Sequence, residues 1–136
     1  MKTRRYFDHI DLRVKSRAVA QKFYSKILPA IGFSSDESGE RWGAFQVPEP
    51  DDKAREFFGF IEDPGHRPNE SRIAFWAETN EEVDRMAEVL RQAGAQNIEG
   101  PQIWADYTPG YYAVFFEDPD GNKLEVCCRA RSIVAE

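Results

Sequence analysis

The order of the predicted elements occurs twice along the 136 residues, and this repeat limits the possible folds more than any other feature. Each half begins with a short strand, continues with an amphipathic helix and ends with several short strands. The two opening strands begin at His9 and Arg72. Because the halves share few identical residues, the repeat depends on element order, and a single α+β domain without internal symmetry stays the alternative.

In the first half, residues 9–14 alternate between polar and apolar side chains, as in a half-buried strand. An apolar stripe at helical spacing follows from Ala18 to Leu28, and we expect Pro29 and Gly32 to end this helix. Residues 34–40 are predicted to form a loop, and residues 42–47 and 56–61 to form strands.

In the second half, residues 72–77 form the predicted first strand, and Thr79 or Asn80 can cap the helix that follows. Gly94 stands where this helix is expected to end. Three strands are predicted near residues 97–104, 111–117 and 122–129. We therefore expect one domain with a first module at about 6–62, a linker at 63–70, a second module at about 71–129 and a frayed tail at 130–136.

Composition excludes several kinds of partner. The net charge of −6 is unfavourable for binding nucleic acid, because the phosphate backbone is also negative. No apolar run is long enough to cross a bilayer, and no apolar signal core follows the start of the chain. Cys127 and Cys128 are adjacent and poorly placed for a disulfide, so we expect a reduced, cytoplasmic protein without a membrane partner.

Several motifs, in order, carry a resemblance to a known family. Asp8-His9-Ile10 opens the first strand, and Arg72-Ile73-Ala74-Phe75 opens the second half. The most specific part runs from Tyr111 to Phe116, through Asp118-Pro119-Asp120-Gly121, to Leu124-Glu125. With these motifs the chain resembles the vicinal oxygen chelate superfamily, which includes glyoxalase I, bleomycin resistance proteins and extradiol dioxygenases.

The resemblance implies an α+β fold of two βαβββ modules, whose strands form a curved mixed sheet around a central cleft. It also implies a homodimer and a divalent metal ion that binds two vicinal oxygens of a small-molecule substrate. His9 and Glu125 match the positions of metal ligands. Glu125 is also the candidate catalytic residue, as a proton shuttle when it is released from the metal.

Arg72 departs from the family pattern, which often has histidine at this position. A guanidinium has no lone pair to offer a metal, so two protein ligands remain of three. Arg72 could replace the metal and bind a carboxylate or phosphate of the substrate. Alternatively, a weak metal site survives on His9 and Glu125, or Arg72 and Glu125 form only an ion pair.

Two aromatic residues complete the candidate substrate site. The resemblance favours Tyr112 over its neighbour Tyr111 as the tyrosine that points inward and donates a hydrogen bond to the substrate. Trp104 could form an apolar wall of the pocket, although core packing is the more common role of a single tryptophan.

Three functions remain open on this evidence. The first is a metal-dependent lyase, isomerase or dioxygenase that acts on a small molecule with vicinal oxygens. The second is a non-catalytic protein that sequesters an antibiotic-like or other small ligand with a degenerate metal site, which the altered ligand set favours. The third is a role in assembly, in which dimerisation is the function.

Overall fold

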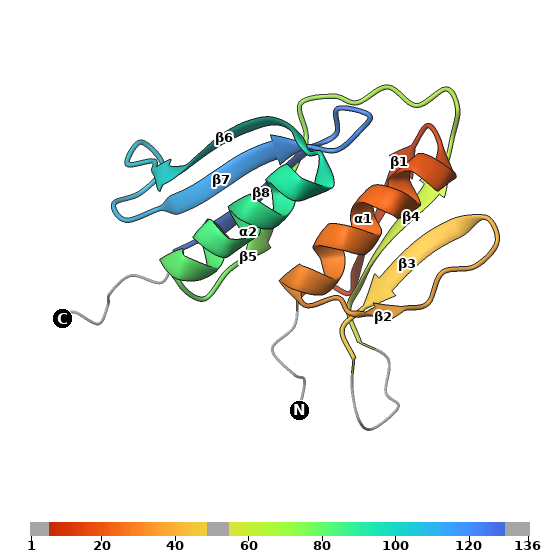
Figure 1. Cartoon of the computed structure of the whole chain (residues 1–136), viewed down its shortest axis with the longest axis horizontal. Coiled ribbons are helices and arrows are strands. Elements are labelled where there is room, and N and C mark those ends of the chain that lie inside the picture. The colour runs from red at the N-terminus through yellow and green to blue at the C-terminus, as the bar shows by residue number, and fades with distance from the viewer. Residues whose placement is uncertain (1–5, 49–54, 130–136) are drawn as a thin grey trace. The chain divides into compact units, whose positions relative to one another are not determined.

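The computed structural model describes residues 6–48 and 55–129 of the chain. The predicted tail at 130–136 lies outside these residues. The chain divides into two compact units, one that ends at His66 and one that begins at Arg67 (Figure 1). Each unit contains one helix and one four-stranded mixed sheet, so the predicted α+β fold and the repeated βαβββ order are confirmed.

The first unit consists of β1 (His9–Val14), α1 (Arg17–Ile31), β2 (Ser35–Asp36), β3 (Trp42–Gln46) and β4 (Phe57–Glu62). Its strand order is β1-β4-β3-β2. β1 runs parallel to β4, whereas the other pairs are antiparallel. The two-residue strand β2 lies within residues 34–40, which we had expected to form a loop throughout, because Ser35 and Asp36 pair with the end of β3.

The second unit consists of β5 (Arg72–Trp76), α2 (Asn80–Ala93), β6 (Gln96–Ile103), β7 (Tyr112–Glu117) and β8 (Lys123–Cys128). Its strand order, β5-β8-β7-β6, is equivalent to that of the first unit. β5 runs parallel to β8, and β7 is antiparallel to both β8 and β6. Each unit thus builds its own sheet from its own part of the chain.

The helices bury the apolar stripes that the sequence predicts. In the first unit, the Tyr24 ring of α1 packs at 5.3 Å from the Phe58 ring and at 5.0 Å from the Phe60 ring of β4. In the second unit, the buried side chains of α2 are Val83, Met86, Ala87 and Leu90. Neither helix in the described part of the chain is long and apolar enough to cross a membrane.

The end of α1 differs from the prediction, because Pro29 lies inside the helix and the helix continues to Ile31. A proline removes only its own N–H from the helix, and the last turn of α1 is still closed by backbone hydrogen bonds to the preceding residue, Leu28. The carbonyl of Leu28 accepts hydrogen bonds from the backbone N–H groups of Gly32, at 3.0 Å, and Phe33, at 2.9 Å. Gly32 therefore ends the helix, as expected, and Pro29 does not.

Candidate active site on the second sheet

The second sheet has two faces with different environments. Alternate residues of a strand point to opposite faces, so Val114 and Phe116 of β7 share one face with Leu124 and Val126 of β8. These four side chains are buried, and this is the face toward the apolar side chains of α2. On the opposite face, a second buried cluster of Ala113, Phe115 and Cys127 packs against Trp104 and Tyr111. The candidate site lies on this second face.

Glu125, the predicted metal ligand and catalytic residue, lies in the middle of β8 directly opposite Phe115. Its side chain is only 4% exposed, and its carboxylate accepts a hydrogen bond from the hydroxyl of Tyr111. A buried carboxylate requires such a partner, because its charge is costly to remove from water. Burial, together with the hydrogen bond to Glu125, raises the pKa of Tyr111 well above its usual value. Tyr111 therefore stays protonated and keeps donating to Glu125 at physiological pH.

Tyr112 has the orientation opposite to the one we expected. Its side chain is on the face of Val114 and Phe116, and its hydroxyl donates to Asp84 of α2 at 2.5 Å. The hydrogen bond to Asp84 raises the pKa of Tyr112. The expectation that Tyr112 points inward is therefore wrong, and Tyr111 has this orientation instead. The predicted role of Tyr112 in substrate binding stays an untested prediction.

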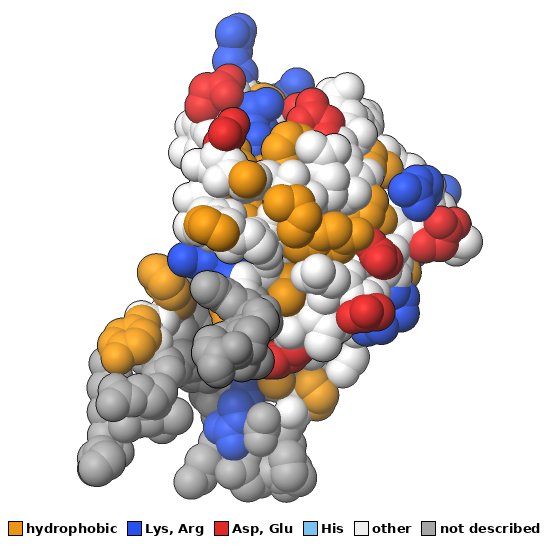
Figure 2. Space-filling view, turned by 90° about the vertical axis from the view of Figure 1, so that its left-hand side faces the viewer, with side chains coloured by type: hydrophobic (Ala, Val, Ile, Leu, Met, Phe, Trp, Pro, Cys, Tyr) orange, Lys and Arg blue, Asp and Glu red, His pale blue; other side chains and the backbone are white. Residues whose placement is uncertain are grey.

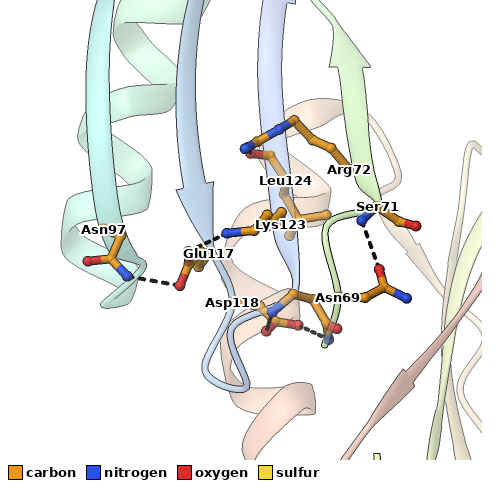
Figure 3. A network of polar contacts seen from close by, with 9 residues as sticks. Asn69, Ser71, Arg72, Asn97, Glu117, Asp118, Lys123 and Leu124 are labelled. Carbon is orange, nitrogen blue, oxygen red and sulfur yellow. Dashed lines mark hydrogen bonds and ion pairs between the residues drawn. The ribbon is translucent and has the colours of Figure 1, made fainter. Parts of the chain in front are cut away.

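Arg72 extends from the start of β5 across β8 toward β7 (Figure 3). One of its terminal nitrogens, Nη1, donates to the backbone carbonyl of Leu124 at 3.2 Å. Its guanidinium carbon lies 4.7 Å from the centre of the Phe115 ring, within the range of a cation–π contact. The Leu124 carbonyl and the Phe115 ring, both uncharged, thus fix the position of the guanidinium, and the Arg72 side chain stays exposed.

Arg72 and Glu125 do not form the ion pair that the sequence left open, since no ion pair joins them in residues 6–48 or 55–129. Beside them, Glu117 accepts hydrogen bonds from Asn97 at 2.9 Å and from Lys123 at 3.2 Å (Figure 3). The hydrogen bond from Asn97 lowers the pKa of Glu117, and the charges of Lys123 and Arg72 act in the same direction. Lys123, rather than Arg72, is therefore the cation paired with this carboxylate.

Four aromatic rings cover the site face and are called here the aromatic layer: Trp104, Tyr107, Tyr111 and Phe115. The Trp104 ring meets the Phe115 ring edge-on at 4.9 Å, and its indole N–H donates to the carbonyl of Ala113 at 2.9 Å. Trp104, predicted to line the site, thus lies in the aromatic layer.

Tyr107 is the most exposed member of the aromatic layer, at 58%. Its ring lies 5.1 Å from that of Tyr111 and 6.2 Å from that of Phe115. Figure 2 shows the side of the molecule that lies at the left of Figure 1, where the β6–β7 connection is; hydrophobic side chains reach the surface there beside acidic ones. At the other end of the layer, the guanidinium carbon of Arg129 lies 5.9 Å from the centre of the Tyr111 ring.

His9, the other predicted metal ligand, lies in the first unit at the start of β1. Its ring stacks on the Phe57 ring at 4.4 Å, and its Nδ1 lies 2.8 Å from a carboxylate oxygen of Asp8. The side chain is exposed and borders a pocket of about 350 Å³ within the first unit. β4 contributes Phe57, Gly59, Phe60 and Ile61 to this pocket, and the carboxylates of Asp11 and Glu37 line it from other segments.

Within either described unit, the donor side chains do not fit a resident metal with three protein ligands. In the described ranges, no group of three or more histidine, cysteine, aspartate or glutamate side chains could hold a metal ion. Arg72 offers no lone pair, and Glu125 is engaged by Tyr111. Burial raises the pKa of the Cys127 thiol, which disfavours the thiolate that a metal needs. Shared ligation of a metal by His9 and Glu125 stays a prediction.

Comparison with known proteins identifies the family. A model of the Glyoxalase/Bleomycin resistance protein/Dioxygenase superfamily matches residues 6–126. The chain belongs to this superfamily. The uncharacterized protein YqjT of Bacillus subtilis (strain 168) is 30% identical over 130 residues, which are 87% of this chain and 94% of YqjT.

Solved structures of this superfamily have the same fold. A glyoxalase/bleomycin resistance protein from Albidiferax ferrireducens T118 aligns with a TM-score of 0.72 at 24% identity, over 90% of this chain and 98% of the other. The fosfomycin resistance protein FosX from Mesorhizobium loti aligns with a TM-score of 0.65 at 14% identity, over 96% of this chain and 98% of the other. At these identities the likeness shows the fold alone.

Sequence reasoning missed Tyr111, Phe115, Tyr107 and Arg129 as members of the site. The alternation of β7 contains a signal for the first two, because Val114 and Phe116 are apolar and fit the helix-covered face. Tyr111 and Phe115 are then left on the other face. No pattern in the sequence predicts the positions of Tyr107 and Arg129, which lie outside the regular strands.

Proposed function

We propose that this chain is a small-molecule-binding member of the superfamily that holds its ligand on the aromatic layer without a resident metal. The observation that carries the proposal is the position of Arg72, whose guanidinium is fixed over Phe115 by the carbonyl of Leu124. Glu125, the carboxylate at the family's ligand position, is already bound by Tyr111. A lining of aromatic side chains with a few fixed polar groups is typical of small-molecule sites.

A metal-dependent lyase, isomerase or dioxygenase is the second candidate, and the geometry of His9 favours it. A carboxylate that holds one ring nitrogen of a histidine commonly orients the other nitrogen toward a metal, and Asp8 could act in this way on His9. In this candidate, His9 and Glu125 hold a divalent ion, and the substrate is a small molecule with vicinal oxygens. The fosfomycin resistance proteins among the structural neighbours show that the fold can serve proteins that act against an antibiotic.

Metal analysis of protein purified without a chelator separates the two candidates. We expect far less than one equivalent of transition metal per chain, and we expect His9→Ala to leave this content unchanged. His66→Ala is the matched control, because His66 is the other histidine of the sequence. One equivalent of metal in the unaltered chain, lost in His9→Ala and retained in His66→Ala, would contradict the proposal and establish the metal-dependent candidate.

A variant designed to gain metal binding also tests whether the unaltered chain lacks a metal site. Arg72→His restores the residue type that the family often has at this position, so it should increase the affinity for added Ni²⁺ or Zn²⁺ above that of the unaltered chain. Calorimetric titration measures the difference. Equal, tight binding by both proteins would mean that the guanidinium is not what weakens the metal site.

A further inference from the structure

The aromatic layer has a guanidinium near each end. Arg72 lies over Phe115, and Arg129 lies over Tyr111. Phe115 and Tyr111 are four residues apart on one face of the sheet, and the Tyr107 ring lies near both of them. A ligand that rests on these rings is therefore close to positive charge in either orientation.

The charge of Arg72 is not neutralised within the described ranges of the second unit. Its one hydrogen bond there goes to an uncharged carbonyl, that of Leu124, and its ring contact is with Phe115. The nearby carboxylate of Glu117 is bound by Lys123 and Asn97. A guanidinium has five N–H donors in a planar fork, so Arg72 retains donors for an anion of matching geometry.

Of the carboxylates on this face, Glu125 is withdrawn from a ligand on the layer, and Glu117 is bound by Lys123 and Asn97. The Glu125 side chain is almost fully buried, and Tyr111 donates to its carboxylate. Tyr107 presents a largely exposed ring beside Tyr111 and Phe115, which provides a surface for stacking. The exposed part of the site thus combines aromatic surface with the guanidinium of Arg72, and one exposed carboxylate, Glu99 of β6, lies opposite Phe115.

We propose that the ligand of this site is an aromatic anion whose ring stacks on the aromatic layer and whose carboxylate, or an anion of similar shape, is bound by Arg72. This inference rests on the proposed small-molecule binding and adds the chemical class of the ligand. Arg72 determines the specificity for charge, and Tyr107 determines the specificity for a flat apolar ring.

Calorimetric titration with two matched probes tests the ligand class. 2-Naphthoate carries the ring and the charge, whereas 2-naphthamide carries the ring without the charge. Because a hydrogen bond to a charged group is stronger than one between neutral groups, we expect 2-naphthoate to bind about two- to thirtyfold more tightly. Inorganic phosphate, an anion without a ring, should bind more weakly than 2-naphthoate.

Substitutions identify the residues that cause the preference for 2-naphthoate over 2-naphthamide. Arg72→Gln keeps a donor for the Leu124 carbonyl and should reduce the preference for 2-naphthoate to near one, and Arg72→Lys should retain part of it. Arg91→Gln is the matched control, because Arg91 is an exposed arginine on α2 that pairs with Glu88, and it should leave both affinities unchanged. Tyr107→Ala should weaken both probes equally. Circular dichroism checks that each variant is folded.

Three results would overturn the proposed ligand class. If 2-naphthamide binds as tightly as 2-naphthoate, or if Arg72→Gln retains the preference, Arg72 does not select an anion, while the proposed small-molecule binding stands. If neither aromatic probe binds to the folded chain, the aromatic layer is not a ligand surface, and both the ligand class and the proposed binding function fail.

Discussion

Tyr111 and Tyr112 are adjacent in the sequence but serve opposite faces of the second sheet. Tyr111 donates to the buried Glu125, whereas Tyr112 donates to Asp84 on the surface of α2. The partners differ in solvation, since Asp84 is exposed and Glu125 is almost fully buried. Removing one hydroxyl should therefore cost much more stability than removing the other.

Tyr111→Phe should lower the free energy of unfolding by about 1–3 kcal/mol, because it leaves a buried carboxylate without its donor. Tyr112→Phe should lower it by less than about 1 kcal/mol, because water can replace the lost partner of an exposed carboxylate. Urea unfolding of the two variants at neutral pH measures both values. A larger loss in Tyr112→Phe than in Tyr111→Phe would mean that the Tyr111–Glu125 bond is not a significant interaction of the site.

At the scale of elements, the start of α2 combines several local signals. Thr79 caps the helix by accepting from the backbone N–H of Glu82 at 3.1 Å. The side chain of Glu82 reaches back to the backbone N–H of Glu78, and acidic residues occupy the first turn. These two hydrogen bonds satisfy backbone donors at the start of the helix, and the macrodipole favours the negative charge of Glu82.

Thr79→Ala removes the side chain that caps α2, so it should lower the free energy of unfolding by about 1 kcal/mol. Thr79→Ser keeps a hydroxyl at the same position and should cost much less. Thermal and urea unfolding of both variants provide the comparison. Equal stability of the alanine and serine variants would show that the capping hydrogen bond contributes nothing measurable.

The positions of helices and strands were easier to predict from the sequence than the directions of single side chains. The alternation of residues 9–14 and the apolar stripes of the two helices depend on many residues, so β1, α1 and α2 appear close to the expected positions. The expected orientation of Tyr112 came from the family resemblance, whereas the alternation of β7 places Tyr112 with Val114 and Phe116 on the helix-covered face. Tyr111 and Tyr112 were exchanged for this reason.

β6 shows a second limit of the prediction. A strand near residues 97–104 was expected, but its pairing with β7 contains register shifts between Gln96 and Glu99 and between Glu99 and Gln102. Gly100 lies in this irregular part with a φ of 94°, and a Cβ there would stand 2.8 Å from the carbonyl of Ala113. Glycine is needed for this close approach, yet its presence in the sequence does not specify where the pairing shifts.

At the scale of the whole molecule, the duplicated βαβββ order is what the sequence and the structure share most clearly. The two units differ in the chemistry of their sheets. The first presents His9 beside a pocket lined mainly by apolar and aromatic side chains, and the second presents the aromatic layer with Arg72 and Arg129. Homodimerisation and a cytoplasmic location stay predictions.

The most direct measurement of the central claim, ligand binding without a resident metal, is a calorimetric titration of 2-naphthoate into the full chain with and without EDTA. We predict the same dissociation constant in both titrations, and no change when Mn²⁺ or Zn²⁺ is added, because Arg72 and the aromatic layer supply the binding energy. Binding that disappears with EDTA and returns with added metal would contradict this account.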